Sequence, residues 1–371
     1  MKTFGEASAL IASHVAPLEI ETVPLSAGAG RVLAADIRSA IPSPRHSVSA
    51  MDGYAVRESD IAGGEPVQVA GEARPGAPFA SVLPAGEAVR IFTGAPLPDG
   101  ADCVIMQEYA QRDADTVRFA AGFGPAKHVR QRGSDFEEGA VLLRRGTRLD
   151  AKTLVAAAAA DVAEITVHRQ PAIAIIATGD ELAEPGSAQL APYAIPDSTS
   201  LAIASLARQA GELLESADIV IVIGGASVGD RDFAKPMFAP HGLALVFDRL
   251  AIKPGKPVWL GRAGARLVLG LPGNPSSAMV TARLFLVPIL ERLQGGEGYH
   301  AWRDMPLATP LPATGDRETF ARAHWGQAGL EVLGNQDSGV QGGLARADWL
   351  IRCPSSQAGL EAGNTVSALL F

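Results

Sequence analysis

Three mainly apolar runs, each followed by a polar turn that contains glycine, constrain the fold of this chain most strongly. The runs span residues 172–177, 219–223 and 266–271. Apolar strands that alternate with helices are typical of a parallel sheet covered on both faces, and helices are predicted at 198–210 and 275–293. The sequence therefore predicts a central, mostly parallel α/β domain over residues 171–296, with a further strand at 244–247.

Small β domains are expected on both sides of this α/β domain, which makes the chain an elongated multidomain protein of class α/β plus β. Thr3 and Glu6 have the spacing of a capping box before a helix at 4–16, and a second helix is predicted at 151–163. Elsewhere short strands are broken by Pro and Gly, as in β domains with tight turns. The expected domains are an N-terminal helical or linker domain (1–45 and 138–170), a small antiparallel β domain (46–137), the α/β domain (171–296) and a C-terminal β-barrel domain (297–371).

Composition excludes several classes of protein. The chain has 371 residues, 47% of them hydrophobic, which excludes a disordered protein, and its net charge of −8 without a long block of one sign argues against nucleic-acid binding. The Ala-rich run 154–160 is far shorter than the roughly 20 residues of a membrane helix. Cys103 and Cys353 are far apart, and this disfavours a disulfide framework or a structural zinc site. With no signal-peptide pattern, we expect a cytoplasmic protein that contacts no membrane.

Polar turns follow the three apolar runs, and in a parallel sheet such turns meet at one edge and bind ligands. The first turn is 178–181, and the second, 224–232, contains three glycines and the carboxylates Asp230 and Asp232, which suit a hard cation. The third, 271–277, opens a helix at Asn274, whose N-terminus suits an oxyanion. Each turn taken singly is explained by turn geometry alone. Their recurrence predicts an anion-plus-metal pocket.

A group of cations lies between the second and third turns. Arg249, Lys253 and Lys256 stand in a segment whose backbone is restricted by Pro254, Gly255 and Pro257. A solvated sheet edge would explain such charges too, but we favour a clamp for phosphate or another oxyanion. In the N-terminal β region, Asp52 and Asp135 precede or follow turns and are equally well explained as turn residues.

Taken together, these segments resemble the MoeA family, the molybdopterin molybdenumtransferases, whose eukaryotic relatives include the E domain of gephyrin and its plant counterpart. The matching segments occur in the family's order and cover nearly the whole chain. They span residues 49–56, 93–98, 177–182, 224–230, 253–257 and 271–275.

The resemblance implies an enzyme that inserts molybdate into adenylated molybdopterin and releases AMP with the help of Mg²⁺. It implies Asp52, Thr93, Asp135, Glu181 and Asp232 as catalytic residues, with Asp232 and Glu181 as metal ligands. It implies a homodimer, in which Asp52, Thr93 and Asp135 reach in from the partner, and contacts with the molybdopterin adenylyltransferase and with molybdoenzyme maturation proteins. The implied substrate-binding residues are Thr178, Gly179, Asp180, Ser198, Gly224, Gly225, Ser227, Gly229, Arg249, Lys253, Lys256, Pro272, Gly273, Asn274, Pro275, Ser276, Ser277, Arg322 and Ser338.

Two departures from the family pattern bear on activity. Family members usually carry another strand and helix where only residues 212–217 stand here, and the family favours Asn at the position of Thr199. Two alternative functions therefore stay open. One is the preceding adenylyl transfer to molybdopterin, and the other is a non-catalytic pterin-binding or assembly role.

Overall fold

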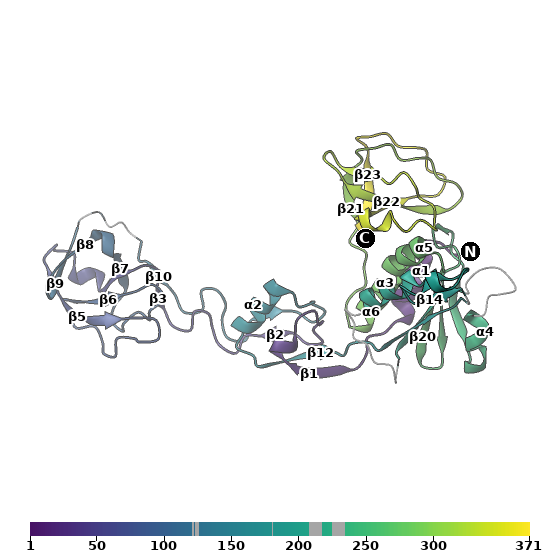
Figure 1. The fold of residues 1–371 in the computed structure, drawn as a ribbon. Coiled ribbons are helices and arrows are strands. Elements are labelled where there is room, and N and C mark those ends of the chain that lie inside the picture. Colours follow the sequence, from purple (N-terminus) through teal and green to yellow (C-terminus); the bar gives the residue numbers. More distant parts are fainter. Residues whose placement is uncertain (121, 123–125, 180, 208–216, 225–233) are drawn as a thin grey trace.

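The computed structural model describes residues 1–371 except 121, 123–125, 180, 208–216 and 225–233, and the side chains of 205–207. The chain is elongated (Figure 1). A β domain lies at one end, a small unit built around α2 (Ala151–Ala159) follows, and the α/β domain with the C-terminal β domain beside it forms the other end.

The central sheet has five described strands in the order β13, β16, β20, β19, β17. Their bounds are β13 (Ile173–Ala177), β16 (Ile219–Ile223), β20 (Arg266–Leu271), β19 (Trp259–Ala263) and β17 (Ala244–Asp248). The first three are parallel, as predicted. Strand β19 pairs antiparallel with both β20 and β17, so it is the one described strand that runs against the others, and the sheet is mixed but mostly parallel. The reason is chain length: two residues join β19 to β20, and a parallel crossover needs a dozen or more. Strand β19 is not predicted from the sequence, because Gly261 and Arg262 interrupt its apolar pattern.

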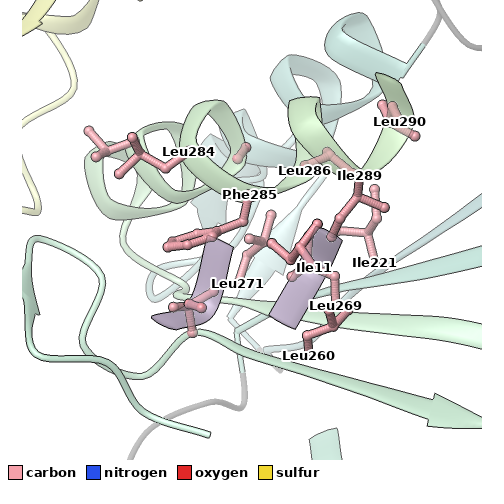
Figure 2. Close-up of a cluster of buried hydrophobic side chains, with 14 of the residues drawn as sticks. Ile11, Ile221, Leu260, Leu269, Leu271, Leu284, Phe285, Leu286, Ile289 and Leu290 are labelled. Atoms are coloured by element: carbon pink, nitrogen blue, oxygen red, sulfur yellow. The ribbon is translucent and has the colours of Figure 1, made fainter. Parts of the chain in front are cut away.

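One face of this sheet is covered by the predicted long helix. It consists of α5 (Pro275–Thr281), a π-helical turn η7 (Ala282–Leu286) and α6 (Val287–Leu293). Figure 2 shows Phe285 and Ile289 of this helix facing Leu269 of the sheet, with Ile11 beside them. Fully burying a side chain of this kind stabilises the fold by roughly 1.5–3 kcal/mol.

Helices α1 (Phe4–His14), α2 and α3 (Ser198–Ala207) begin at the residues expected from the sequence, whereas α4 (Ala234–Phe238) is not among the predicted helices. Helix α1 begins with the predicted capping box, formed by Thr3 and Glu6. Its apolar face packs into the core of the α/β domain, whereas the sequence predicts it in the separate domain of residues 1–45 and 138–170. Helices α3 and α4 complete the described helices of this domain. No helix in the described part of the chain is long and apolar enough to cross a membrane.

The N-terminal half contains two β units. The smaller pairs β1 (Ile20–Pro24) with β12 (Glu164–His168) and β2 (Ile37–Arg38) with β11 (Val141–Leu143). In the outer domain, β5 and β6 are parallel, so this sheet is not wholly antiparallel as predicted. Its six-stranded order is β7 (Cys103–Met106), β4 (Gly53–Val56), β6 (Glu87–Ile91), β5 (Val67–Ala73), β9 (Thr116–Phe119) and β8 (Ala110–Asp113), and β3 (Val48–Ser49) pairs with β10 (Val129–Arg130) beside it.

The C-terminal domain shares a strand with the α/β domain. Strand β18 (Ile252–Lys253) leaves the central region and pairs in parallel with β22 (Glu318–Trp325). The other strands are β24 (Trp349–Cys353), β25 (Thr365–Leu370), β21 (Arg303–Pro306) and β23 (Leu330–Val332). In the described chain no pairing joins the end strands β18 and β21, and the closed barrel stays a prediction. The shared strand holds the cationic segment next to the C-terminal domain.

Candidate functional site

The described residues directly after β13 and β16 lie against the ends of the neighbouring strands, as the sequence predicted. Thr178 donates its backbone N–H to the Ile223 carbonyl over 3.0 Å, and Gly224 donates to Leu271 over 3.1 Å. Gly224 has a φ of +86°, and a Cβ there would lie 2.8 Å from the Thr178 carbonyl oxygen. Glycine is required at this position, because the close approach and the positive φ both disfavour a side chain.

A cavity of about 660 Å³ opens where these three turns meet. Its size falls in the range of small-molecule sites. Its lining mixes apolar and proline side chains with hydroxyl, amide and carboxylate groups in nearly equal number. It is lined by Ala177, Thr178, Glu181, Leu182, Ile195, Pro196, Asp197, Ser198, Thr199, Ile223, Gly224, Pro257, Pro272, Gly273, Asn274, Pro275 and Gln341.

A second cavity, of about 560 Å³, adjoins the first. The two share Pro257, Pro272 and Asn274, so they form one groove. Lys253 and Lys256 line the second cavity, as predicted for the oxyanion clamp, and Arg317 from the start of β22 joins them. Sequence reasoning missed Arg317, because only the pairing of β18 with β22 brings it there. Ser277, Gln336, Asp337 and Ser338 also line this cavity.

Arg322 and Ser276 do not line either cavity. Arg322 is 1% exposed, and its guanidinium donates hydrogen bonds to Ser276 Oγ and to the carbonyls of Asn335 and Asp337. Ser276 is fully buried and donates to the Val340 carbonyl. Burial lowers the pKa of Arg322. Of the two serines expected as alternatives at the anion site, Ser277 lines the second cavity and Ser276 does not. The polar atoms of Ser276 and Arg322 hold residues 335–340 beside the groove instead.

Two carboxylates line the first cavity. Glu181 does so as predicted, and Asp197 was not among the predicted site residues. Asp197 accepts the backbone N–H groups of Thr199 and Ser200 and so begins helix α3. The described residues contain no group of three or more His, Cys, Asp or Glu side chains that could hold a metal ion. Five predicted site residues lie outside the described part of the chain: Asp180, Gly225, Ser227, Gly229 and Asp232.

Two other predicted residues lie near the groove without lining it. Gly179 has a φ of +155°, and a Cβ there would approach the Glu181 carboxylate to 2.8 Å. Arg249, at the end of β17, is half exposed, and its Nε lies 3.9 Å from the Asp248 carboxylate. Neither residue is in the lining of the two cavities.

The predicted acids of the N-terminal region lie at the other end of the same chain (Figure 1). Asp52 accepts the backbone N–H of Thr93 over 2.8 Å and its hydroxyl over 2.7 Å. The backbone bond and then the hydroxyl bond lower the pKa of Asp52, so it is an anion near neutral pH. Asp135 lies in the connector, where its N–H donates to the Ser43 carbonyl over 2.9 Å. One chain alone does not bring these residues to the groove.

Comparison with known proteins places these observations in a family. The MoeA N-terminal region (domain I and II) matches residues 2–160, a probable molybdopterin binding domain matches 211–292, and the MoeA C-terminal region (domain IV) matches 304–371. A molybdopterin molybdenumtransferase from Haemophilus influenzae is 33% identical, with 95% of this chain and 94% of the relative covered. The chain belongs to the MoeA family.

Other MoeA relatives agree in sequence and in structure. A molybdopterin molybdenumtransferase from a Nostoc species is 32% identical over 95% of this chain and 88% of its own. A solved molybdopterin biosynthesis MoeA protein from Pyrococcus horikoshii superposes with a TM-score of 0.84 at 25% identity over 100% of both chains. A second structure of a MoeA protein from Pyrococcus gives a TM-score of 0.81 at 29% identity, covering 99% of this chain and 98% of its own.

This MoeA chain has fewer residues than the number of positions in its alignments with MoeA relatives. The alignment with the Haemophilus relative covers 383 positions and that with the Nostoc relative 390, against 371 residues here. Those relatives therefore contain residues without a counterpart in this chain. The strand and helix whose absence was expected from the sequence would fall near 208–216, outside the described residues.

Proposed function

We propose that this chain is an enzyme of molybdenum cofactor synthesis that inserts molybdate into adenylated molybdopterin and releases AMP. The observation that carries the proposal is the two-part groove at the strand ends. One part has apolar and proline walls suited to a planar ring, and the other gathers Lys253, Lys256 and Arg317. Relatives that match over nearly the whole chain are named molybdopterin molybdenumtransferases.

The cationic part of the groove suits the anions of this reaction. Lys253 and Lys256 stand on a segment fixed between β18 and Pro257, and Arg317 is held through its Nη1–H bond to the Ile252 carbonyl. Phosphate oxygens and molybdate are both negatively charged and repel each other. The three cations that line the second cavity reduce this repulsion between the two anions. Bringing both anions together is a large part of the catalytic task, because a fixed orientation removes much of the entropic barrier.

We also propose that Mg²⁺ takes part, held by Glu181 and Asp232. Glu181 lines the first cavity, and carboxylate oxygens are the ligands that Mg²⁺ prefers. When bound, the ion would neutralise charge on the oxygens of the pyrophosphate link. Asp232 lies outside the described residues, so its part rests on the family resemblance.

The acids of the outer β domain fit the proposal through a homodimer. Asp52 is oriented by Thr93 and negatively charged, yet it lies far from the groove of its own chain. We propose that the outer domain of a second copy brings Asp52, Thr93 and Asp135 to the groove. A cytoplasmic location and contacts with the molybdopterin adenylyltransferase and with maturation proteins of molybdoenzymes belong to the same proposal.

A non-catalytic pterin-binding role is the second candidate, since relatives contain residues that this chain lacks. The test is to mix purified protein with adenylated molybdopterin, molybdate and Mg²⁺ and to follow AMP by chromatography. The enzyme proposal predicts AMP release that depends on molybdate. Tight binding of the pterin with no AMP release would support the second candidate and contradict the first.

A further inference from the structure

Residues 333–343 of the C-terminal domain reach the groove and are attached to the α/β domain by side-chain hydrogen bonds. Asn274 Nδ2 donates to Ser338 Oγ over 3.0 Å, and Ser198 Oγ donates to Gln341 Oε1 over 2.9 Å. The buried Ser276 makes a third connection, to the Val340 carbonyl. This loop is therefore held at both cavities at once, Gln341 at the first and Ser338 at the second.

The loop is also fixed from its own domain. Gln336 accepts the Arg322 backbone N–H over 2.9 Å and donates to the Arg322 and Leu333 carbonyls over 2.8 and 2.7 Å. Together with the guanidinium bonds of Arg322, these contacts leave the backbone of 335–340 little freedom. The position of Gln341 at the cavity is thus set in advance of any ligand, which lowers the entropic cost of binding.

The hydrogen bond from Ser198 orients the Gln341 side-chain amide at the cavity. A side-chain amide has an acceptor oxygen and two N–H donors. The oxygen already accepts one hydrogen bond, from the Ser198 hydroxyl, whereas Gln341 Nε2 makes no hydrogen bond to a described residue. Gln341 comes from the C-terminal domain, and the other lining residues of the first cavity come from the α/β region. The amide therefore has both N–H donors free for whatever occupies the cavity, while one lone pair of its oxygen is already used.

We propose that Gln341 is a specificity-determining residue that donates a hydrogen bond to a carbonyl oxygen or unprotonated nitrogen on the planar heterocycle of the substrate. The inference rests on the proposed function and deepens it, because it names the feature of the ring that this cavity selects. The adenine and the pterin of the substrate both carry such acceptors, and binding measurements separate the two. A ring with a donor at that place would leave two donors facing each other and would be rejected.

The decisive substitution is Gln341→Glu, which keeps the oxygen that accepts from Ser198 and replaces the donors by an acceptor. Gln341→Met removes both functions, and Gln111→Glu on the exposed edge of the outer β domain is the control for the change of charge. Affinities for AMP and for molybdopterin are measured separately by anaerobic calorimetry between pH 7.5 and 4.5. At neutral pH, Gln341→Glu should weaken the binding of one of the two ligands about tenfold, with the other ligand and Gln111→Glu unchanged.

The pH profile separates donation from a merely structural role. A protonated carboxyl is a donor again, so the defect of Gln341→Glu should shrink as the pH falls towards the ordinary glutamate pKa of about 4.3, while that of Gln341→Met should not. A loss of affinity for AMP alone would show that Gln341 donates to the adenine. A loss of affinity for molybdopterin alone would show that it donates to the pterin. Unchanged affinities, or equal losses of both ligands at every pH, would overturn the inference and leave the proposed function standing. A wild-type chain that bound neither ligand would overturn both.

Discussion

Replacing Gly224 by alanine tests whether the close packing of the three strand ends forms the site. An alanine at a φ of +86° destabilises the folded backbone, and this cost is partly offset because alanine also lowers the conformational entropy of the unfolded chain. The net loss in the free energy of unfolding is about 1 kcal/mol. The added Cβ would also lie 2.8 Å from the Thr178 carbonyl oxygen, and overpacking against backbone costs about 1–3 kcal/mol more. We expect Gly224→Ala to lower the free energy of unfolding by about 2–4 kcal/mol and to reduce kcat/KM at least tenfold, because the turns must move apart.

Gly242→Ala is the matched control for this substitution. Gly242 has a φ of +71°, but a Cβ there would meet nothing within 4 Å. It should therefore show the backbone cost alone, about 1 kcal/mol, and full activity. Urea denaturation followed by fluorescence measures the stabilities, and AMP release measures the activity. If the two variants were equally stable and equally active, the argument from the close approach of the strand ends would be refuted.

Three further predictions test the charges and buried groups. Lys256→Ala should raise the molybdate concentration for half-maximal AMP release about tenfold at low salt, and by less at high salt because salt screens the charge. The control is Arg266→Ala, at the opposite end of β20, which should leave this concentration unchanged. Equal effects of the two substitutions would show that Lys256 is not part of the oxyanion site. Thr93→Val should raise the pKa of Asp52, as measured by NMR titration. The stabilisation from the Thr93 bonds is present above the ordinary carboxyl pKa and is lost as pH falls through the lowered one. The variant keeps the backbone bond, so an unshifted pKa would contradict the role of the hydroxyl bond. Burial raises the pKa of Cys353 to about 11, so iodoacetamide at pH 8 should label this thiol only after unfolding, and rapid labelling of the native protein would show that the C-terminal core is open.

The sequence was most informative where physical constraints are local. The apolar runs of β13, β16 and β20 predicted buried parallel strands, and the glycine-containing turns after them predicted the cavity. Lys253 and Lys256 were recognisable because Pro and Gly restrict the backbone around them. These features depend on neighbours in the chain, so their pattern is visible in one sequence.

Features that depend on distant pairing could not be read in the same way. Arg317 and Gln341 reach the groove only because β18 joins β22 and residues 333–343 cross to the α/β domain. The choice between Ser276 and Ser277 could not be made from the sequence, because a hydroxyl at a helix start is equally suited to a ligand or to a buried arginine; in the structure Ser276 is buried against Arg322 and Ser277 lines the second cavity. The reversed strand β19 could not be predicted either, although the sheet is mostly parallel as expected, since only the short link between β19 and β20 forces this antiparallel pair.

A structure of the protein with adenylated molybdopterin bound in the absence of molybdate would test the central claim most directly. The account predicts a planar ring in the first cavity, between Ile195 and Ile223, and negatively charged groups beside Lys253, Lys256 and Arg317 in the second. A ligand bound on another face of the molecule, with this groove empty, would contradict it.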